Sequence, residues 1–336
     1  MRPRIDPRPA TRRRFAPLGV ALFCFGIVLN LQAALAGPLD SVVGVRAEVP
    51  ADARTAGVLG TEREGSGVVI DDSGLVLTIG YLIMESTSAE IVLGDDRAVP
   101  ADVVAYDYDS GFGLLRPISP IEIDPILLGD SKPLTERSQV LVASFGGSDA
   151  AIPAYVVSRR DFAGYWEYLL PNAIFTAPPH RRFGGAALIG PDGRLLGIGS
   201  LLVGDAGDAE EPLPGNMFVP IDALKPIMAD LLTLGRAGAP ARPWLGLYSE
   251  EHRGRVFVNR VAPEGPAAAA GIAMDDLIVE VAGRPVEGLA DFYRKIWAIG
   301  EAGVDIPLTV LTGAGLKSVS VRSGDRYDYL KLDPTY

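Results

Sequence analysis

The chain has 336 residues, of which 48% are hydrophobic and 22% charged, a composition typical of folded globular proteins and not of disordered ones. Its length predicts two domains that need no disulfides. The formal net charge of −11 argues against nucleic acid as a partner, because phosphate binding requires Lys and Arg. The single cysteine, Cys24, excludes a disulfide scaffold, and the two histidines, His180 and His252, exclude most histidine-rich metal sites. We expect no cofactor and no metal.

Residues 1–36 have the three parts of a secretory signal peptide. Six arginines lie within residues 1–14, an apolar stretch runs from Phe15 to Ala36, and it ends in the small-residue pattern ALA. The string TRRRF at residues 11–15 also resembles a twin-arginine signal. A retained membrane anchor is the alternative, because the apolar stretch is long enough to span a bilayer. We therefore predict an exported, periplasmic protein that meets the membrane only if the signal is kept.

Short runs of β-forming residues follow, separated by turns rich in Gly, Pro and Asp. The predicted strands are 41–45, 67–70, 75–78, 90–93, 103–105, 139–143, 154–158, 186–189 and 195–200. Many short strands at this spacing indicate an all-β barrel or sandwich. The sequences DDSG at 71–74 and PDG at 191–193 predict tight turns, where Gly adopts the positive φ that other residues resist.

The periodicity changes after this region. Apolar residues at a spacing of three to four predict an amphipathic helix over 222–234, and the Gly/Ala/Pro-rich residues 235–243 predict a linker. Beyond the linker, the patterns predict strands at 244–247, 255–258, 277–281 and 307–312, with helices at 264–270 and 288–298. Mixed strands and helices over about 90 residues indicate a second, α+β domain.

Several segments, in order along the chain, resemble motifs of the HtrA/DegP family of periplasmic serine proteases. The clearest are GSGVVIDDSGLVLT at 65–78 and GGAALIGPDGRLLGI at 184–198. Further matches are ADVVAYD at 101–107, LGDS at 128–131, ASFG at 143–146, FVPI at 218–221, WLGL at 244–247 and the run at 261–286.

This resemblance implies a mostly β protein, with a trypsin-like double β-barrel followed by a PDZ-like α+β domain. We divide the chain into a signal peptide at 1–36, a catalytically degenerate protease-fold domain at 37–238, and a PDZ-like domain with the C-terminal tail at 239–336.

Carried over residue by residue, the family's catalytic positions hold the wrong side chains. The histidine position falls on Tyr81, the aspartate position on Gly111 and the nucleophile position on Phe183, while a glycine of the oxyanion hole falls on Arg181. Acyl transfer in this family needs an oxygen nucleophile, an imidazole base and a carboxylate together. No histidine precedes position 180, so no shift of register restores a base. We predict a catalytically inactive homologue of a serine endopeptidase.

Two interpretations of the former active site stay open. Tyr81, Phe183 and Arg181 form an aromatic, partly cationic binding patch, or the ring of Phe183 fills the vacated pocket as core. His180 is the single imidazole of the barrel region, and we expect it to be an exposed loop residue; a makeshift dyad with a nearby serine is the alternative.

The PDZ-like domain predicts a binding function for polypeptide C-termini or extended segments. In such domains a peptide adds as a strand, and backbone N–H groups of a loop bind its terminal carboxylate. That loop is predicted at Trp244, Leu245, Gly246 and Leu247, with Arg242 as an additional cation. The alternative is a module for packing or for forming oligomers.

The resemblance thus favours an exported pseudoprotease that serves as a chaperone, a scaffold or a regulator of an envelope process, with an active protease relative as one candidate partner. The rival functions are an active endopeptidase with a non-standard site and a structural subunit of an envelope assembly. An oligomer stays open, although residues 37–60 lack the aromatic side chains by which proteases of this family form trimers.

Overall fold

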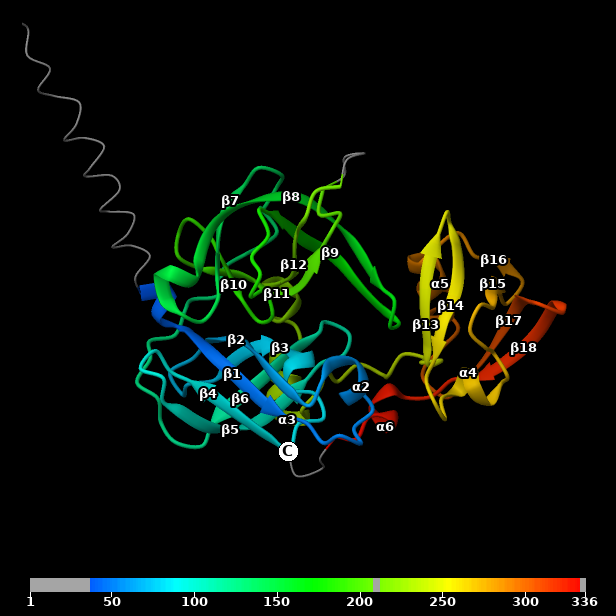
Figure 1. Ribbon diagram of the computed structural model, residues 1–336, viewed down its shortest axis with the longest axis horizontal. Helices are drawn as coiled ribbons and strands as arrows, with labels where there is room; N and C mark the ends of the chain where they lie inside the picture. Colours follow the sequence, from blue (N-terminus) through cyan, green and yellow to red (C-terminus); the bar gives the residue numbers. More distant parts are fainter. Residues whose placement is uncertain (1–36, 208–211, 333–336) are drawn as a thin grey trace, which may run out of the picture. The chain divides into compact units, whose positions relative to one another are not determined.

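The computed structural model describes residues 37–207 and 212–332, which form two closed β-barrels and a separate C-terminal sheet (Figure 1). The predicted mostly β fold class is confirmed. The predicted signal peptide at 1–36 lies outside the described residues. Within the described ranges, no helix has both the length and the apolar character needed to cross a bilayer.

The first barrel is closed by six antiparallel strands in the order β1-β2-β3-β6-β5-β4. Their bounds are β1 (Val42–Glu48), β2 (Glu62–Val69), β3 (Val76–Ile79), β4 (Ser88–Val92), β5 (Ala98–Tyr106) and β6 (Phe112–Pro117), and the short helix α2 (Ala56–Leu59) follows β1. The predicted turn between β2 and β3 is present. Gly74 has a φ of 80°, and Asp71 Oδ1 accepts hydrogen bonds from the N–H groups of Ser73 and Leu75.

The second barrel is closed in the order β10-β11-β12-β9-β8-β7. Its strands are β7 (Gln139–Ala143), β8 (Ala151–Gly164), β9 (Tyr168–Ala177), β10 (Ala187–Ile189), β11 (Leu195–Val203) and β12 (Gly215–Pro220). The long β8–β9 hairpin pairs as far as Gly164 and Tyr168, and its tip, residues 165–167, is called the β8–β9 turn below. This hairpin extends from the barrel to β13, where Ser249 N–H donates to Tyr165 O over 2.8 Å (Figure 1).

The C-terminal sheet has the strand order β13-β14-β15-β17-β18, and β16 pairs with β15. The bounds are β13 (Leu247–His252), β14 (Arg255–Val261), β15 (Leu277–Val281), β16 (Arg284–Pro285), β17 (Asp305–Thr312) and β18 (Gly315–Arg322), with helices α4 (Pro266–Ala269) and α5 (Leu289–Trp297). Helix α5 buries Leu289, Phe292, Tyr293 and Ile296, the i, i+3, i+4, i+7 face of an amphipathic helix. This face closes the core of the sheet.

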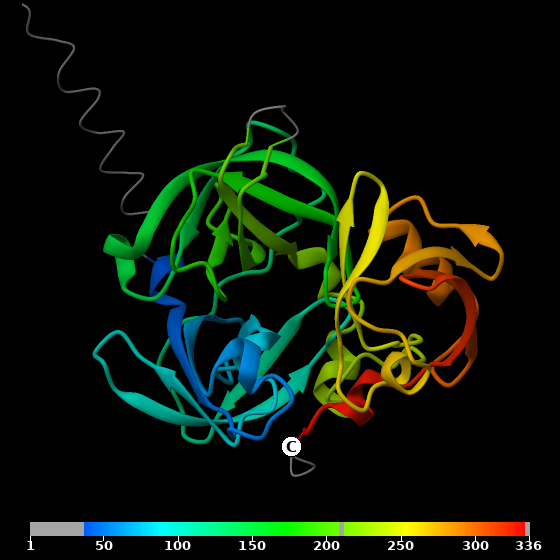
Figure 2. The same ribbon diagram turned by 45° about the vertical axis from the view of Figure 1, so that its right-hand side comes forward.

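The chain then returns to the first barrel through α6 (Arg326–Tyr329), near the described C-terminal end in Figure 2. Tyr327 Oη donates to Tyr106 O over 3.2 Å, and Lys331 N–H donates to Glu85 Oε1 over 2.8 Å. Burial would raise the pKa of Glu85, but hydrogen bonds from Thr55, Lys331 and Arg54 hold that pKa below its ordinary value. The tail is therefore fastened to the barrel by an ionised carboxylate.

Two sequence predictions of local structure are wrong. The helix expected over 222–234 is a 3-10 turn at Ile221–Ala223 followed by a shorter helix, α3 (Met228–Leu234), because Pro226 lacks an N–H and disfavours helical backbone at the residue before it. The strand expected at 244–247 does not form as such: residues 244–246 are a loop, and β13 begins at Leu247. The N–H groups of this loop make other contacts, described below.

The two barrels meet at a tight backbone crossing. Ser66 N–H on β2 donates to Gly184 O over 2.8 Å, and Thr78 Oγ1 donates to Ser66 O over 2.7 Å. Gly185 has a φ of 73°, and a Cβ there would lie 1.8 Å from Ser66 O. The crossing therefore requires glycine at position 185.

We predict that Gly185→Ala lowers the free energy of unfolding by at least about 3 kcal/mol, because it combines a strained φ with a backbone clash. The measurement is urea denaturation at equilibrium. Gly94→Ala is the matched control, since an added Cβ at Gly94 meets no atom within 4 Å, and we expect its effect to stay within about 0.5 kcal/mol. Equal effects of the two substitutions would contradict this description of the crossing.

Candidate functional site: the inter-barrel cavity and the carboxylate loop

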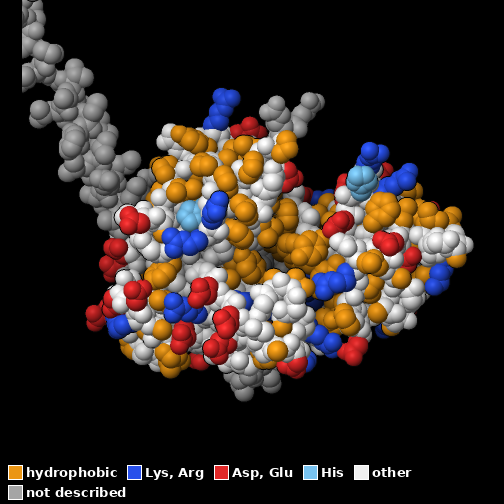
Figure 3. Space-filling view, in the orientation of Figure 1, with side chains coloured by type: hydrophobic (Ala, Val, Ile, Leu, Met, Phe, Trp, Pro, Cys, Tyr) orange, Lys and Arg blue, Asp and Glu red, His pale blue; other side chains and the backbone are white. Residues whose placement is uncertain are grey.

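The three predicted triad positions are brought together by the fold. Tyr81, Gly111 and Phe183 all line one cavity of about 320 Å³. Most of its wall is apolar or aromatic, and hydrophobic side chains gather in the hollowed middle of the face shown in Figure 3. The cavity is therefore suited to apolar groups.

Tyr81 is held in place by a hydrogen bond across the barrels. Its Oη donates to Ser200 O over 3.0 Å. A Cβ added at Gly184 would lie 2.8 Å from Tyr81 Oη, so the glycine leaves room for the hydroxyl. Burial raises the pKa of the Tyr81 phenol well above its ordinary value. The phenol stays protonated at neutral pH and serves as a hydrogen-bond donor, not as a base.

The other two predicted triad positions, Gly111 and Phe183, carry no reactive side-chain group. Gly111 has a φ of 84°, and a side chain there would meet the Tyr168 hydroxyl, which lies 3.2 Å from the position of an added Cβ. Tyr168 Oη itself donates to Ser110 O over 2.8 Å. Phe183 is half-buried and belongs to none of the buried core clusters. Its ring lines the cavity and leaves part of its surface accessible.

Arg181 does not line this cavity; it lies at a neighbouring hollow that shares Tyr81 and Phe183. The cations of the cavity wall are three other arginines, which the sequence analysis did not single out. The Arg260 guanidinium lies 3.6 Å from the ring centroid of Tyr248, and that of Arg326 lies 3.5 Å from the ring of Tyr108. Arg54 likewise lies 4.6 Å from the ring of Tyr329. The cavity thus has an aromatic wall with stacked cations.

The expectation that His180 is an exposed loop residue is wrong. Its relative exposure is 7%. Its backbone N–H donates to Asn216 Oδ1 over 2.6 Å, and Asn216 Nδ2 donates back to His180 O over 3.0 Å. The ring is bound to backbone on both sides, since Nε2 lies 3.0 Å from Ala150 O and Nδ1 accepts from Arg182 N–H. This imidazole is a structural element of the loop that precedes Phe183.

The predicted carboxylate loop does bind a carboxylate, that of Glu167 from the chain itself. Leu245 N–H donates to Glu167 Oε2 over 2.9 Å, and Leu247 N–H donates to Oε1 over 2.7 Å. Gly246, between them, has a φ of 79°. Trp244 takes no part in this binding, because its N–H donates to Gly324 O.

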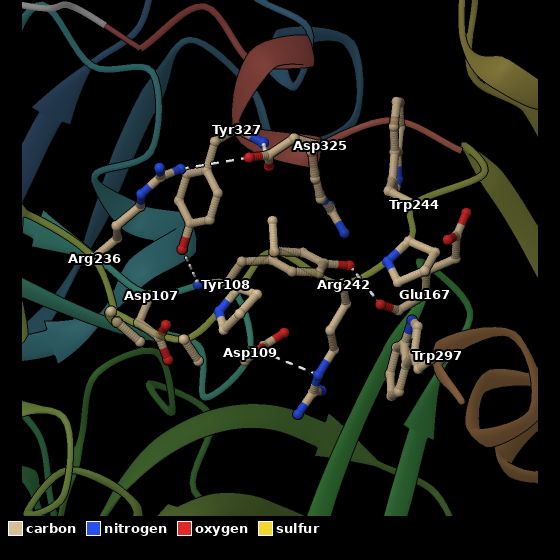
Figure 4. A pocket seen from close by; sticks show the side chains of 17 residues that line it. Asp107, Tyr108, Asp109, Glu167, Arg236, Arg242, Trp244, Trp297, Asp325 and Tyr327 are labelled. Carbon is tan, nitrogen blue, oxygen red and sulfur yellow. Dashed lines mark hydrogen bonds and ion pairs between the residues drawn. The ribbon is translucent and has the colours of Figure 1, made fainter. Parts of the chain in front are cut away.

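Arg242 does not reach the Glu167 carboxylate. It forms an ion pair with Asp109 over 3.2 Å, and its guanidinium lies 4.6 Å from the ring centroid of Trp297. Figure 4 shows this pair in a polar pocket of about 310 Å³ that Glu167 also lines. Burial raises the pKa of Asp109, and Arg242 opposes that effect.

Glu167 is almost fully removed from water. Its relative exposure is 2%, and its φ of 56° places it in the left-handed region at the tip of the hairpin. Burial raises the pKa of the Glu167 carboxyl to about 7, while the N–H groups of Leu245, Leu247 and Gly246 act in the opposite direction. A charged carboxylate is costly to bury, so the hydrogen bonds from the N–H groups of Leu245 and Leu247 are what make this position tolerable.

Sequence reasoning missed Glu167, and a signal for it exists. It is the single charged residue in the run YWEYLL at 165–170, which is otherwise aromatic and aliphatic. An acidic side chain within such a run must find hydrogen-bond donors when the run is buried. Its partners, however, lie 78 and 80 residues further along the chain.

Comparison with known proteins agrees with this architecture. Residues 65–198 match the trypsin-like peptidase domain, and residues 243–322 match the PDZ domain. Solved structures with the same fold include the serine endoprotease from Yersinia pestis (TM-score 0.51, 20% identity, covering 88% of this chain and 97% of that chain). The HtrA-type protease AlgW, solved with a decapeptide, has a TM-score of 0.52 at 18% identity and covers 90% and 99% of the two chains.

Curated relatives are serine endoproteases. DegS of Salmonella typhimurium is 26% identical over 270 residues, covering 74% of this chain and 72% of that protein. The periplasmic serine endoprotease DegP of Escherichia coli is 27% identical over 248 residues, or 69% of this chain, and the match spans 51% of its length. A trypsin-like peptidase domain followed by a PDZ domain defines the class. The chain is an HtrA-like protein.

We predict that Glu167 makes stability fall as pH rises. The pKa of its carboxyl is about 7 in the folded chain and 4.5 ordinarily. Its contribution to the free energy of unfolding is therefore fully present below pH 4.5 and is lost as the pH rises through 7. The unfolding free energy of the wild type, relative to that of Glu167→Gln, should decrease by roughly 2 to 3 kcal/mol between pH 5 and 8.

Urea denaturation at each pH measures this difference. Glu136→Gln is the control, because Glu136 is an exposed residue ahead of β7, and we expect its difference from the wild type to show no such trend. A difference between wild type and Glu167→Gln that stays constant with pH would contradict the buried position of the carboxylate.

Proposed function

We propose that this HtrA-like protein is an exported pseudoprotease that binds polypeptides and does not hydrolyse them. The observation that carries the proposal is the chemistry of the inter-barrel cavity. At the positions assigned to the triad the cavity holds a protonated phenol, a glycine and a benzyl ring. These groups supply neither a nucleophile nor a base for acyl transfer.

The distribution of histidine supports the same conclusion. His180 has both ring nitrogens on backbone groups, and His252 lies at the exposed end of β13 in the C-terminal sheet. The chain has no third histidine. A triad of the family type would need an imidazole in the cavity, and neither of these residues lines it.

Two features support polypeptide as the ligand class. The cavity has a predominantly apolar wall, which suits hydrophobic side chains of an extended or unfolded segment. The PDZ domain contributes the loop Leu245–Leu247, whose N–H groups bind a carboxylate. We therefore propose a chaperone, scaffold or regulatory role in the cell envelope, with an active protease relative as one candidate partner.

The proposal includes the organisation predicted from the sequence: a signal peptide at 1–36, a protease-fold domain at 37–238, and the PDZ domain with its tail at 239–336. Periplasmic relatives support export. The names of the relatives describe active endoproteases, so hydrolysis is the rival function, and the experiment below separates the two.

We predict that the purified chain cleaves unfolded casein at the background rate and takes up no label from a fluorophosphonate probe, because the triad positions hold no nucleophile and neither histidine lines the cavity. Active DegP serves as the positive control. Turnover or labelling that co-purifies with the chain, and that Tyr81→Phe or His180→Ala abolishes without unfolding it, would contradict the proposal.

A further inference from the structure

A segment of the chain lies between β13 and α5 of the PDZ domain and is hydrogen-bonded to both; the space that it fills is called the PDZ groove below. Strand β13 pairs with β14 on one side. On its other side, Ser249 N–H donates to Tyr165 O over 2.8 Å, the hydrogen bond that an added peptide strand would accept. The occupying segment is the β8–β9 turn, residues 165–167, with the first residues of β9.

The β8–β9 turn presents a carboxylate at the end of the groove. Glu167 accepts from the N–H groups of Leu245 and Leu247, the donors that would bind the terminal carboxylate of a peptide. The two bonds are 2.9 and 2.7 Å long, within the range of well-formed N–H···O hydrogen bonds. The side chain of Glu167 thus takes the place of a chain terminus.

An apolar side chain accompanies the carboxylate. Leu169 is 7% exposed and belongs to the buried cluster of the PDZ domain, together with Leu245, Leu247 and Ile296. Its neighbours on β9, Tyr168 and Leu170, belong instead to the core cluster of the barrels. The alternation of a β-strand therefore directs Leu169 into the PDZ domain and its two neighbours into the barrels.

Helix α5 holds the same segment from the opposite side. Tyr293 Oη donates to Gly164 O over 2.8 Å and accepts from Glu167 N–H over 3.2 Å. Arg294 of α5 forms an ion pair with Asp161 of β8. The turn is thus bound by the loop, by the edge of β13 and by the helix, which are the three walls of the groove.

We infer that the β8–β9 turn is an internal ligand of the PDZ groove, with Glu167 in the place of a terminal carboxylate and Leu169 in the place of an apolar last residue. A polypeptide that ends in a free carboxylate and an apolar residue binds this groove by displacing the turn. The inference rests on the proposed function, since it concerns how the peptide-binding site is regulated.

Intramolecular binding gives the turn an advantage over a free peptide. A tethered ligand acts at an effective concentration that reaches the millimolar range for short connections. The apparent affinity for a peptide is reduced by the fraction of molecules with an open groove. A free peptide of modest intrinsic affinity therefore binds the wild type weakly. Substitutions that release the turn from the groove strengthen peptide binding.

The test compares the full chain with a variant that combines Glu167→Ala and Leu169→Asp. The probe is a fluorescein-labelled heptapeptide ending in Tyr-Tyr-Leu with a free carboxylate, followed by fluorescence anisotropy. We expect the variant to bind at least about ten-fold more tightly than the wild type, and the C-amidated peptide to bind neither. Glu136→Ala with Leu127→Asp, the same changes at exposed positions, should behave as the wild type.

Amide hydrogen exchange verifies the mechanism in the same samples. Leu245 and Leu247 should be protected in the wild type without peptide, exchange in the variant, and regain protection when peptide is added. Equal peptide affinity of wild type and variant would overturn the internal ligand and leave the proposed polypeptide binding intact. If the two amides of the variant exchange and the peptide still does not bind, the result would contradict both the internal ligand and the proposed polypeptide binding. Continued protection in the variant would also overturn the inference.

Discussion

A carboxylate leaves water only where other groups replace its hydration, and this constraint determines how the β8–β9 hairpin is built into the protein. Glu167 lies at the tip of the hairpin, buried, and its hydrogen-bond donors belong to a loop of the PDZ domain. Without those donors the hairpin would have to expose its tip together with the apolar side chain of Leu169. The hairpin and the PDZ domain therefore depend on each other for their buried state.

The same hairpin also lines the inter-barrel cavity. Tyr165, Trp166 and Tyr168 contribute to the wall, and the rings of Trp166 and Tyr168 are stacked with centroids 5.4 Å apart. One face of the segment thus meets the inter-barrel cavity, and the other lies between β13 and α5. Under the proposed function, the cavity and the peptide-binding site therefore share one structural element, the β8–β9 hairpin.

The architecture was predictable from the sequence because its signals are local. The DDSG turn, the Gly-rich segments around 65–78 and 184–198, and the apolar face of α5 each lie within one element. Strand β9 was missed because Pro171 and the left-handed Asn172 interrupt its β pattern. The contact between Glu167 and Leu245 joins residues 78 positions apart and uses a backbone donor. No side-chain motif in the sequence therefore predicts it. The buried position of His180 likewise depends on a partner far along the chain, Asn216 of β12, which lies 36 residues away.

The titration of the Glu167 carboxyl tests the central claim most directly. Carbon-detected NMR of the full chain, labelled at the glutamate side chains and assigned with Glu167→Gln, follows this one group through pH. A carboxyl buried against the loop should titrate with a midpoint near 7. A midpoint between about 4 and 5, the ordinary range of an exposed glutamate, would contradict the buried position of this carboxyl.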